Sequence, residues 1–471
     1  MPYALPPPEV VCLTHDESRA SARDGRPDSV GFVASARHPL KVHYEDAADA
    51  AQAADALGFA ELAWDVQVDA LGFRAPQLPD GLLGDDGGGP ELDIYLASVG
   101  AWEGWAEPES WTDTVDGDAY ASSPAFVVLD RGLPPEWLGP YVVHEFNHVL
   151  QIATDVGEGV LPLWEGVATA AQSWTLGGAG FWDEDVPSYQ EAPWAPAITG
   201  DSETLWGGWE VGFAYEYGAA LWVLHLDEVV GTGDGSVGPA LWEAAAQGGD
   251  GDEPDGLDAF AALSGEDLGT ALSRLARTRW LTGERWDARG LADAQTWGEE
   301  MLVPVESELN TGRAGFDLAV HGQAFFLLDA SGSDELHVSL QGGSAALAAF
   351  SQAGAAPLFD VSQGLNPQLF LDPAGHEQIV LVVSNLGAAG FDGDDDPWVF
   401  TRFIIETESG AGCGCATSPA PSRTSALALL LALSLWACSA RRAPAPAGPG
   451  PCSPSSGARR RASPRWARRA R

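Results

Sequence analysis

The sequence contains little cysteine and no long membrane-type apolar run, and each shortage excludes a class of protein. Only Cys12 of the five cysteines precedes residue 413, so the body of the chain carries no disulfide framework. The apolar run 425–438 is shorter than the roughly 20 residues that an ordinary membrane-spanning helix needs. With 471 residues and 45% hydrophobic side chains, the chain can form two globular domains with tails.

Positive charge is also scarce. The chain has 24 lysines and arginines against 68 acidic residues, and ten of the 24 follow residue 408, where no acidic residue occurs. A surface this negative repels phosphate, which argues against a nucleic-acid partner. The acidic excess is typical of a solubilised exterior, which is the interpretation we favour, although carboxylates also attract divalent cations.

Histidine is rare as well, at nine residues, yet two stand four positions apart in the stretch His144-Glu145-Phe146-Asn147-His148. On a helix, positions i and i+4 project from the same face, so the two imidazoles can hold one metal ion. The glutamate between them can then reach a water on that ion. Pro134-Pro135 just upstream and the apolar residues around the motif predict a buried helix, with Pro140 near its first turn.

A third ligand must come from elsewhere, because a catalytic zinc site takes three protein ligands. The metzincin continuation would need glycine at 151 and histidine at 154, where this chain has Gln151 and Thr154. Glu165 opens the alanine-rich stretch 163–172, which predicts a second helix, and it is the first candidate. Asp155 is the weaker alternative, because it would have to fold back over very few residues.

A catalytic zinc site also needs a hydrogen-bond donor that stabilises the negatively charged oxygen formed during the reaction. The stretch 211–230 predicts a buried helix whose polar members include Tyr215, Tyr217 and His225. Tyr217 is the candidate donor, and Tyr215 is the substitute. The alternative is that these are core tyrosines whose hydroxyls bond to backbone. His225 is expected to be a core histidine.

The rest of the first 300 residues reads as alternating strands, helices and loops. Four short apolar runs predict strands at 30–34, 40–44, 92–98 and 125–130. Apolar spacing predicts helices at 46–71 and 257–286. Loops are expected at 101–124, 173–210 and 232–256. The tryptophans of 173–210 suit either an irregular packed surface or a lid over a cleft.

From residue 314 the pattern changes to short alternating runs separated by Gly, Asn and Pro. These runs predict an antiparallel β-sandwich with strands at 316–320, 324–329, 335–341, 345–352, 368–371, 378–385 and 398–407. The acidic segments 249–255 and 392–396 are of a kind that can bind Ca²⁺. The EF-hand spacing with its final glutamate is absent, so solvated turns are the default interpretation.

The pair His144-Glu145-x-x-His148, followed by a glutamate on the next helix, resembles the gluzincin group of zinc metallopeptidases. The resemblance implies that His144, His148 and Glu165 bind Zn²⁺, with Glu145 as general base and Tyr217 as the oxyanion donor. The implied activity is that of a zinc-dependent endopeptidase acting on a protein or peptide substrate. In such folds a strand beside the cleft pairs with extended substrate, and 92–98 or 125–130 is expected to be that edge strand.

The C-terminal region has three parts. Gly412-Cys413-Gly414-Cys415 is followed by the apolar run 425–438 and then by Arg441-Arg442. This order resembles the myxobacterial sorting signal known as MYXO-CTERM, which implies a protein that is secreted or held at the cell surface. Together with the zinc motif, it resembles the secreted metalloproteases of myxobacteria. No signal-peptide pattern is visible near the N-terminus, so we expect the true start to lie elsewhere.

These observations predict an α+β protein with five parts. The parts are a disordered N-terminus at 1–29, a zincin-like metallopeptidase domain at 30–300, a β-sandwich at 310–408, a sorting or anchor tail at 409–442 and a basic low-complexity extension at 443–471. The rival hypothesis is a surface adhesion or scaffold protein whose zinc site is structural or vestigial. In both cases the tail would associate with a membrane or cell envelope.

Overall fold

The structure, a computed structural model, describes residues 25–409 apart from short gaps. The gaps are 79–86, 100–103, 111–112, 115–119, 178–184, 203–210, 213, 247–253, 310–311, 332, 352–357, 389–390 and 392–398. The chain divides into two units, Met1–Gly412 and Cys413–Arg471. The second unit lies outside the described residues, as do the predicted tail 409–442 beyond Ser409, the extension 443–471, the acidic segment 392–396 and most of 249–255.

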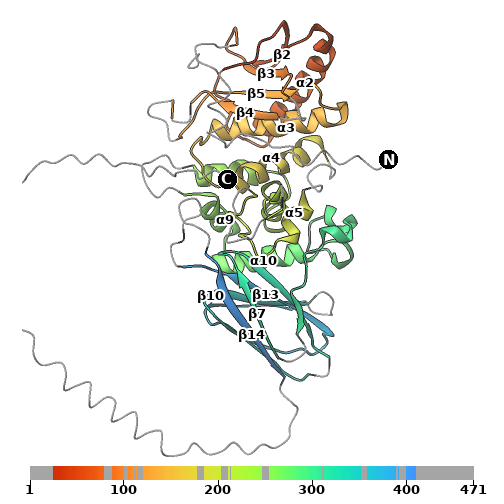
Figure 1. Ribbon diagram of the computed structural model, residues 1–471, viewed down its shortest axis with the longest axis vertical. Helices are drawn as coiled ribbons and strands as arrows, with labels where there is room; N and C mark the ends of the chain where they lie inside the picture. The colour runs from red at the N-terminus through yellow and green to blue at the C-terminus, as the bar shows by residue number, and fades with distance from the viewer. Residues whose placement is uncertain are drawn as a thin grey trace, which may run out of the picture. The chain divides into compact units, whose positions relative to one another are not determined.

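Helices and strands are both abundant, as an α+β protein requires. The first sheet has five strands in the order β1-β2-β3-β5-β4, with β2, β3 and β5 parallel (Figure 1). Its strands are β1 (Gly31–Ala34), β2 (Leu40–Tyr44), β3 (Leu92–Ala97), β4 (Gly104–Pro108) and β5 (Ala125–Asp130). The central strands β3 and β5 are buried throughout, which explains their continuous apolar sequences.

Strand β4 corrects two expectations. It lies inside 101–124, which was predicted to be a loop, and it pairs antiparallel with β5 as the last strand of the sheet. The sequence did not predict this strand because it contains Gly104 and Pro108, and both residue types are depleted in strands. Proline is nevertheless tolerated at a sheet edge, where β4 lies. The prediction that 92–98 or 125–130 forms the edge strand is therefore wrong, since β3 and β5 both have neighbours on each side.

The described chain begins at residue 25, within the segment 1–29. Arg26, in the segment predicted to be disordered, donates to Asp93 on β3 at 2.8 Å and also pairs with Glu109. All three side chains are buried. The two carboxylates compensate the guanidinium charge, so a charged residue can be held inside the fold.

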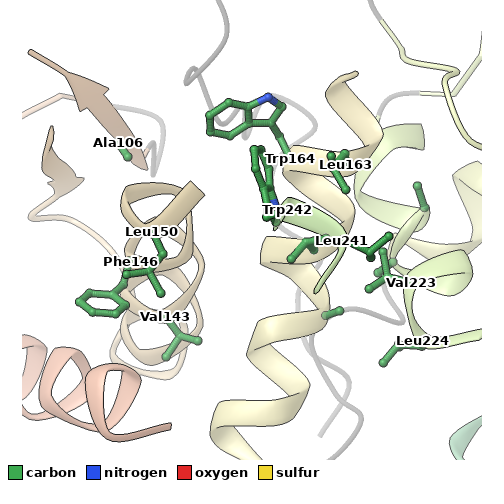
Figure 2. Packing of buried hydrophobic residues seen from close by; sticks show 14 of the residues in the cluster. Ala106, Val143, Phe146, Leu150, Leu163, Trp164, Val223, Leu224, Leu241 and Trp242 are labelled. Atoms are coloured by element: carbon green, nitrogen blue, oxygen red, sulfur yellow. The ribbon is translucent and has the colours of Figure 1, made fainter. Parts of the chain in front are cut away.

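Two helices pack against this sheet, one along β1 and β2 and the other along β4 and β5. Helix α2 (Ala50–Ala63) continues into the π-helical segment η2 (Trp64–Ala70), which together match the predicted helix 46–71. Alanines at 53, 56, 60 and 63 form the buried face of α2. Helix α3 (Pro135–Ile152) packs on α2 and on α4 (Leu161–Leu176). The core between the helices is large, and Figure 2 shows side chains of α3, α4, α7 and α8 within it.

The predicted helix 211–230 is divided into three pieces. They are α6 (Tyr215–Gly218), α7 (Ala220–Leu224) and the π-helical η3 (His225–Val230). Gly166 on α4 explains how closely this region packs, because a Cβ there would lie 3.2 Å from the carbonyl carbon of Ala219. Two further helices, α5 (Val186–Glu191) and α8 (Val237–Ala245), lie where loops were predicted.

The predicted helix 257–286 is two helices, α9 (Gly256–Ser264) and α10 (Leu268–Trp280). Gly265 ends α9 with a φ of 68°, a left-handed conformation that glycine adopts without strain. Asp267 then caps α10 by accepting a hydrogen bond from the amide of Thr270. None of the helices among the described residues is long and apolar enough to cross a bilayer.

Two sheets follow, in the orders β11-β10-β13-β8-β6 and β12-β9-β14-β7. Their strands are β6 (Ser307–Leu309), β7 (Gly312–Leu318), β8 (Gln323–Asp329), β9 (Leu336–Gln341), β10 (Ser344–Ser351), β11 (Phe359–Leu365), β12 (Gln368–Leu371), β13 (Gln378–Asn385) and β14 (Thr401–Ser409). One apolar cluster joins side chains of both sheets, so they pack face to face. Strands β6 and β11 were not predicted from the sequence.

Helix α10 packs on the other face of the β10-β13-β8 sheet. Trp280 lies against Phe325 and Phe350, within a cluster separate from the one between the sheets. The neighbouring Arg279 is fully buried and donates to the Tyr189 carbonyl at 2.7 Å and to the Gln323 side chain at 3.3 Å. The same cation therefore ties α10 and α5 to the sheet.

Candidate metal centre

Helix α3 carries both histidines of the motif. It follows β5 after a short turn and begins at Pro135. The first amides of a helix have no acceptor within the helix, so proline costs no hydrogen bond at this position. His144 and His148 lie one turn apart and are 5% and 0% exposed. Their rings meet edge to face, with centroids 4.7 Å apart. The i, i+4 spacing therefore produces the shared face that the sequence predicted.

Glu165 completes the group from the second turn of α4. Its Oε2 lies 3.1 Å from His144 Nε2 and 3.3 Å from His148 Nε2, and the two Nε2 atoms are 3.0 Å apart. All three residues are buried, and their nitrogen and oxygen donors form a group that can hold a metal ion. The structure thus brings together the three residues that the sequence proposed as ligands.

The electrostatics of the group favour a charged carboxylate. Burial by itself raises the pKa of Glu165, but His148 and His144 outweigh burial and lower that pKa to about 2. Burial lowers the pKa of both imidazoles. In His148 the carboxylate of Glu165 outweighs it and leaves the pKa raised, whereas in His144 burial prevails. A negative oxygen beside two imidazoles is the donor set that a divalent cation prefers.

Asp155, the alternative ligand, is occupied elsewhere. Its carboxylate accepts a hydrogen bond from the amide of Gly157 at 2.8 Å, in the turn that follows α3. Burial raises the pKa of this carboxyl. The side chain is therefore a turn-capping acceptor, and it is not part of the group formed by Glu165 and the histidines.

Glu145 lies beside strand β4. It is 1% exposed, and a Cβ added at Gly104 would lie 3.2 Å from its Oε1. Glycine at 104 therefore lets the edge strand approach the carboxylate of Glu145. This places the carboxylate between the histidine pair of α3 and the last strand of the sheet.

The two candidate tyrosines have different surroundings. The ring of Tyr217 stacks on His144, with centroids 5.8 Å apart and an interplanar angle of 24°. Tyr215 is fully buried, and its hydroxyl donates to the carbonyl of Pro196 at 3.1 Å. Burial raises the pKa of Tyr215. Only Tyr217 is therefore brought to the group, and Tyr215 is a core residue with a backbone partner. His225 is likewise a core histidine, bonded to Thr278.

Between these tyrosines, Glu216 is a buried carboxyl. Its two oxygens accept hydrogen bonds from the amide and the hydroxyl of Ser202, at 3.0 and 2.8 Å. Burial raises the pKa of Glu216 to about 7, although the bonds from Ser202 act in the opposite direction. The ordinary value is 4.5. The folded protein therefore holds a proton on Glu216 over a pH range in which the unfolded chain has lost it.

This shift predicts a pH-dependent effect of Glu216→Gln in the metal-free protein. As pH rises from 4.5 to about 7, the parent loses stability, because the unfolded state releases its proton first. We therefore expect the unfolding free energy of the variant minus that of the parent to increase by about 2–3 kcal/mol between about pH 5 and about pH 8. Urea unfolding at both pH values measures this. An unchanged difference between the two proteins would contradict it.

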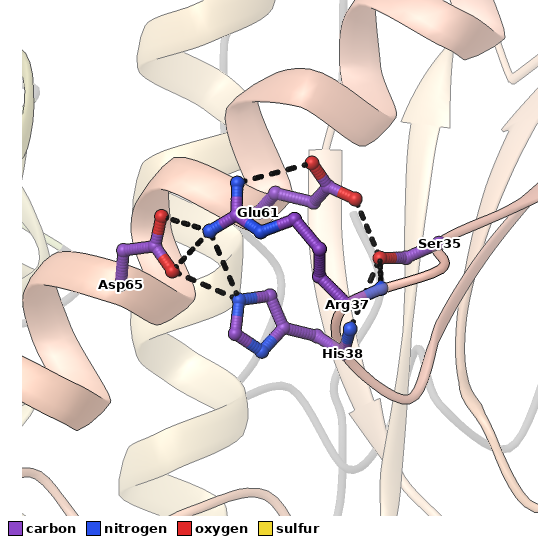
Figure 3. Close-up of polar contacts among 5 residues, drawn as sticks. All are labelled: Ser35, Arg37, His38, Glu61 and Asp65. Atoms are coloured by element: carbon purple, nitrogen blue, oxygen red, sulfur yellow. Dashed lines mark hydrogen bonds and ion pairs between the residues drawn. The ribbon is translucent and has the colours of Figure 1, made fainter.

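A second cluster with metal-ligand types lies at the start of the fold, where His38, Asp65 and Asp69 come together. Figure 3 shows two of its members, His38 and Asp65, with their neighbours Ser35, Arg37 and Glu61. His38 Nε2 lies 2.9 Å from Asp65 Oδ1, and Arg37 pairs with both oxygens of the same carboxylate. Arg37 also approaches Glu61 at 3.6 Å. Because a guanidinium already compensates the carboxylate, this cluster is a surface ion-pair network.

Sequence reasoning missed three buried amides next to the site. Gln67, Asn147 and Gln151 are all fully buried, and Gln151 Oε1 lies 2.6 Å from His148 Nδ1. The available signal was the presence of two amides in an otherwise apolar helix, at 147 and 151. Gln67 gave no such signal, because it contacts Asn147 from 80 positions away.

Comparisons with known proteins are sparse. No protein-family model matches the sequence, and no curated protein matches it. Among solved structures, the chain is similar to aminopeptidase A of Legionella pneumophila in complex with aspartic acid, with a TM-score of 0.30 and 13% identity over 79% of this chain and 36% of that one. It is also similar to BtGH115A, a family GH115 4-O-methyl-α-glucuronidase with specificity for decorated arabinogalactans, with a TM-score of 0.14 and 9% identity over 71% of this chain and 53% of that one. Neither likeness is close enough to assign a fold or an activity.

Proposed function

We propose that this protein is a zinc-dependent endopeptidase whose metal is held by His144, His148 and Glu165. The observation that carries the proposal is the spacing of the three donor atoms, which lie 3.0–3.3 Å from one another. Zinc bonds of about 2.0–2.2 Å with tetrahedral angles separate ligand atoms by about 3.3–3.6 Å. The spacing therefore fits zinc with small adjustments. Two imidazoles and one carboxylate are also a ligand set of catalytic rather than structural zinc sites.

A bound zinc ion would act as a Lewis acid, lowering the pKa of a water and polarising a carbonyl. The residues of the chain supply the rest. The carboxylate of Glu145 would accept a proton from the attacking water and deliver it to the leaving amine. The hydroxyl of Tyr217, whose ring lies against His144, would donate to the oxyanion of the tetrahedral intermediate. Each group would act from a position fixed by packing within α3, α4 and α6.

Strand β4 is the proposed platform for the substrate. It is the last strand of its sheet, and Gly104 brings it against the carboxylate of Glu145. A peptide in extended conformation that aligned with β4 would run past the proposed general base. Backbone recognition of this kind tolerates many side chains, so it suits an endopeptidase that acts on proteins or peptides. The segment that carries this role is the one predicted to be a loop.

The C-terminal motif supports a proposal about location. Its cysteine-containing motif, apolar run and arginine cluster resemble those of a myxobacterial surface-sorting signal, so we propose that the protein is exported and secreted or held at the cell surface. This proposal is independent of the metal centre. A reporter protein exported by its own signal peptide and carrying residues 409–442 would test the sorting role of the tail. A distribution identical to that of the same reporter without the tail would contradict it.

Removing and restoring the metal tests the proposed activity. We expect the purified protein to contain about one zinc ion per chain and to cleave casein. A chelator should abolish cleavage, and added zinc should restore it, because the three ligands are otherwise intact. Metal content without chelator-sensitive cleavage would instead support the adhesion or scaffold hypothesis, in which the site is structural. Absence of any bound divalent metal would reject the peptidase and the structural zinc site, and would leave the scaffold hypothesis with a vestigial site.

A further inference from the structure

A continuous chain of buried amides leads from helix η2 to the metal centre. Gln67 donates to the carbonyl of Val143 and to Thr175, both at 3.2 Å. Asn147 donates to Gln67 Oε1 at 3.0 Å, and Gln151 donates to Asn147 Oδ1 at 2.7 Å. The chain ends at His148, whose Nδ1 lies 2.6 Å from Gln151 Oε1. Gln67, Asn147, His148 and Gln151 are all 0% exposed, so water does not compete for these bonds.

The direction of the chain is set at two backbone carbonyls. The amide group of Gln151 also donates to the carbonyl of Trp164 at 3.0 Å, as Gln67 does to that of Val143. A carbonyl oxygen can only accept, so each of these amides must present its NH₂ group there. Turning either amide would place two oxygens against each other in a buried site, which is costly. Both ends of the chain therefore impose the same direction.

This direction decides the protonation of His148. Gln151 must present its oxygen to Nδ1. An amide oxygen can only accept a hydrogen bond, so Nδ1 must carry the proton and donate it. The neutral imidazole then carries its proton on Nδ1 and leaves the lone pair of Nε2 free to bind a metal. We infer that Gln151 is a positioning residue that holds His148 in its metal-binding tautomer before any metal arrives. The metal in question is the one in the proposed function, on which this part of the inference rests.

His144 is held differently. Its Nδ1 lies 3.4 Å from the amide nitrogen of Gln172, which is only part-buried, and its Nε2 faces Glu165 at 3.1 Å. If the amide donates to Nδ1, that nitrogen carries no proton, and the neutral imidazole carries its proton on Nε2. In this tautomer Nε2 has no free lone pair for a metal. In that arrangement His144 would change tautomer on metal binding, whereas His148 would not. The two ligands of one motif thus differ in preorganisation, and Gln172 provides a matched control for Gln151.

The first test uses the unaltered, metal-free protein. Long-range ¹H–¹⁵N spectra at alkaline pH, where both imidazoles are neutral, report which ring nitrogen carries the proton. We expect His148 as the Nδ1–H tautomer, whether or not the protein proves to be a peptidase. A predominant Nε2–H tautomer for His148 would overturn the inference. This measurement requires no variant, so a folding defect cannot obscure it.

The second test compares Gln151→Met with Gln172→Met, since both changes keep side-chain length and remove the amide. We expect Gln151→Met to mix the tautomers of His148 and to weaken zinc binding by about 10–100-fold, as loss of an outer partner typically does. Gln172→Met should bind zinc at least as tightly as the parent, because it removes a partner of the His144 tautomer that does not bind metal. Competition with a chromophoric chelator measures both affinities, and thermal melts check that each variant is folded.

The outcomes separate this inference from the proposed function. A parent that binds zinc and cleaves peptides, with a Gln151→Met variant that matches it in tautomer and affinity, would overturn only the role of Gln151. A parent that binds no divalent metal but shows the Nδ1–H tautomer would reject the proposed function and leave the amide chain supported. Equal losses of affinity in the Gln151 and Gln172 variants would contradict the asymmetry.

Discussion

Replacing Glu145 with glutamine is expected to abolish peptide cleavage while zinc binding stays close to that of the parent. The side chain keeps its size, so the packing against β4 at Gly104 is retained. Glutamine cannot accept and return a proton, and removal of a general base typically costs about 10²–10⁴-fold in rate. The metal ligands lie on other residues, so zinc content should be unaffected. The variant therefore separates binding of the metal from use of the metal.

The matched control is Glu136→Gln, which makes the same chemical change on the same helix. Glu136 is exposed in the first turn of α3, two turns before the histidine pair. Both variants remove one negative charge from α3, so a general electrostatic effect on this acidic protein would appear in each. We expect kcat to fall only in Glu145→Gln. Parent-like casein cleavage by Glu145→Gln, in a folded and zinc-loaded protein, would sink the proposed mechanism.

Replacing Glu165 with glutamine should have the largest effect on metal binding. The pKa of Glu165 is about 2, so its carboxylate is fully charged at neutral pH, and glutamine removes that charge from the ligand set. The two imidazoles remain, but the amide oxygen is a weaker ligand for a divalent cation. We expect zinc affinity to fall by at least about 100-fold, more than is typical for loss of an outer partner. Cleavage should be lost at zinc concentrations that saturate the parent.

Asp155→Asn is the control for this second prediction. It makes the equivalent change at the other acidic residue considered as a ligand, which instead accepts from Gly157 at 2.8 Å. Its zinc affinity should equal that of the parent, with at most a modest loss of stability from the weakened turn. Chelator competition on both variants gives the comparison. If Asp155→Asn loses zinc and Glu165→Gln keeps it, the ligand assignment is reversed.

Much of the metal centre could be predicted from the sequence because its key spacing is local. Four positions on a helix place His144 and His148 on one face in any fold that keeps the helix. The sequence favoured Glu165 over Asp155 without deciding between them, and the structure places Glu165 beside the two histidines. The strands at 31–34, 40–44, 92–97 and 125–130 were also predictable, because short runs rich in β-branched, aromatic and other apolar residues favour strands.

Other features were decided by contacts that no local pattern reports. Strand β4 exists because β5 offers a pairing edge, although its own residues include a glycine and a proline. The stretch 215–230 has the composition of one helix, yet it is divided into three helical segments where it packs closely on α4. Local composition describes what a segment can bury, whereas its neighbours decide where its backbone must bend.

The sequence by itself therefore determined the ligand types, their spacing on α3 and the mixed α and β character of the chain. Only the tertiary structure decided which strand lies at the edge beside Glu145, which tyrosine reaches His144 and how His148 is oriented. The amide chain illustrates the reason, since Gln67 meets Asn147 across 80 positions and Gln151 meets the Trp164 carbonyl on another helix. Helical periodicity acts over one or two turns, whereas hydrogen bonds between elements depend on how the elements pack.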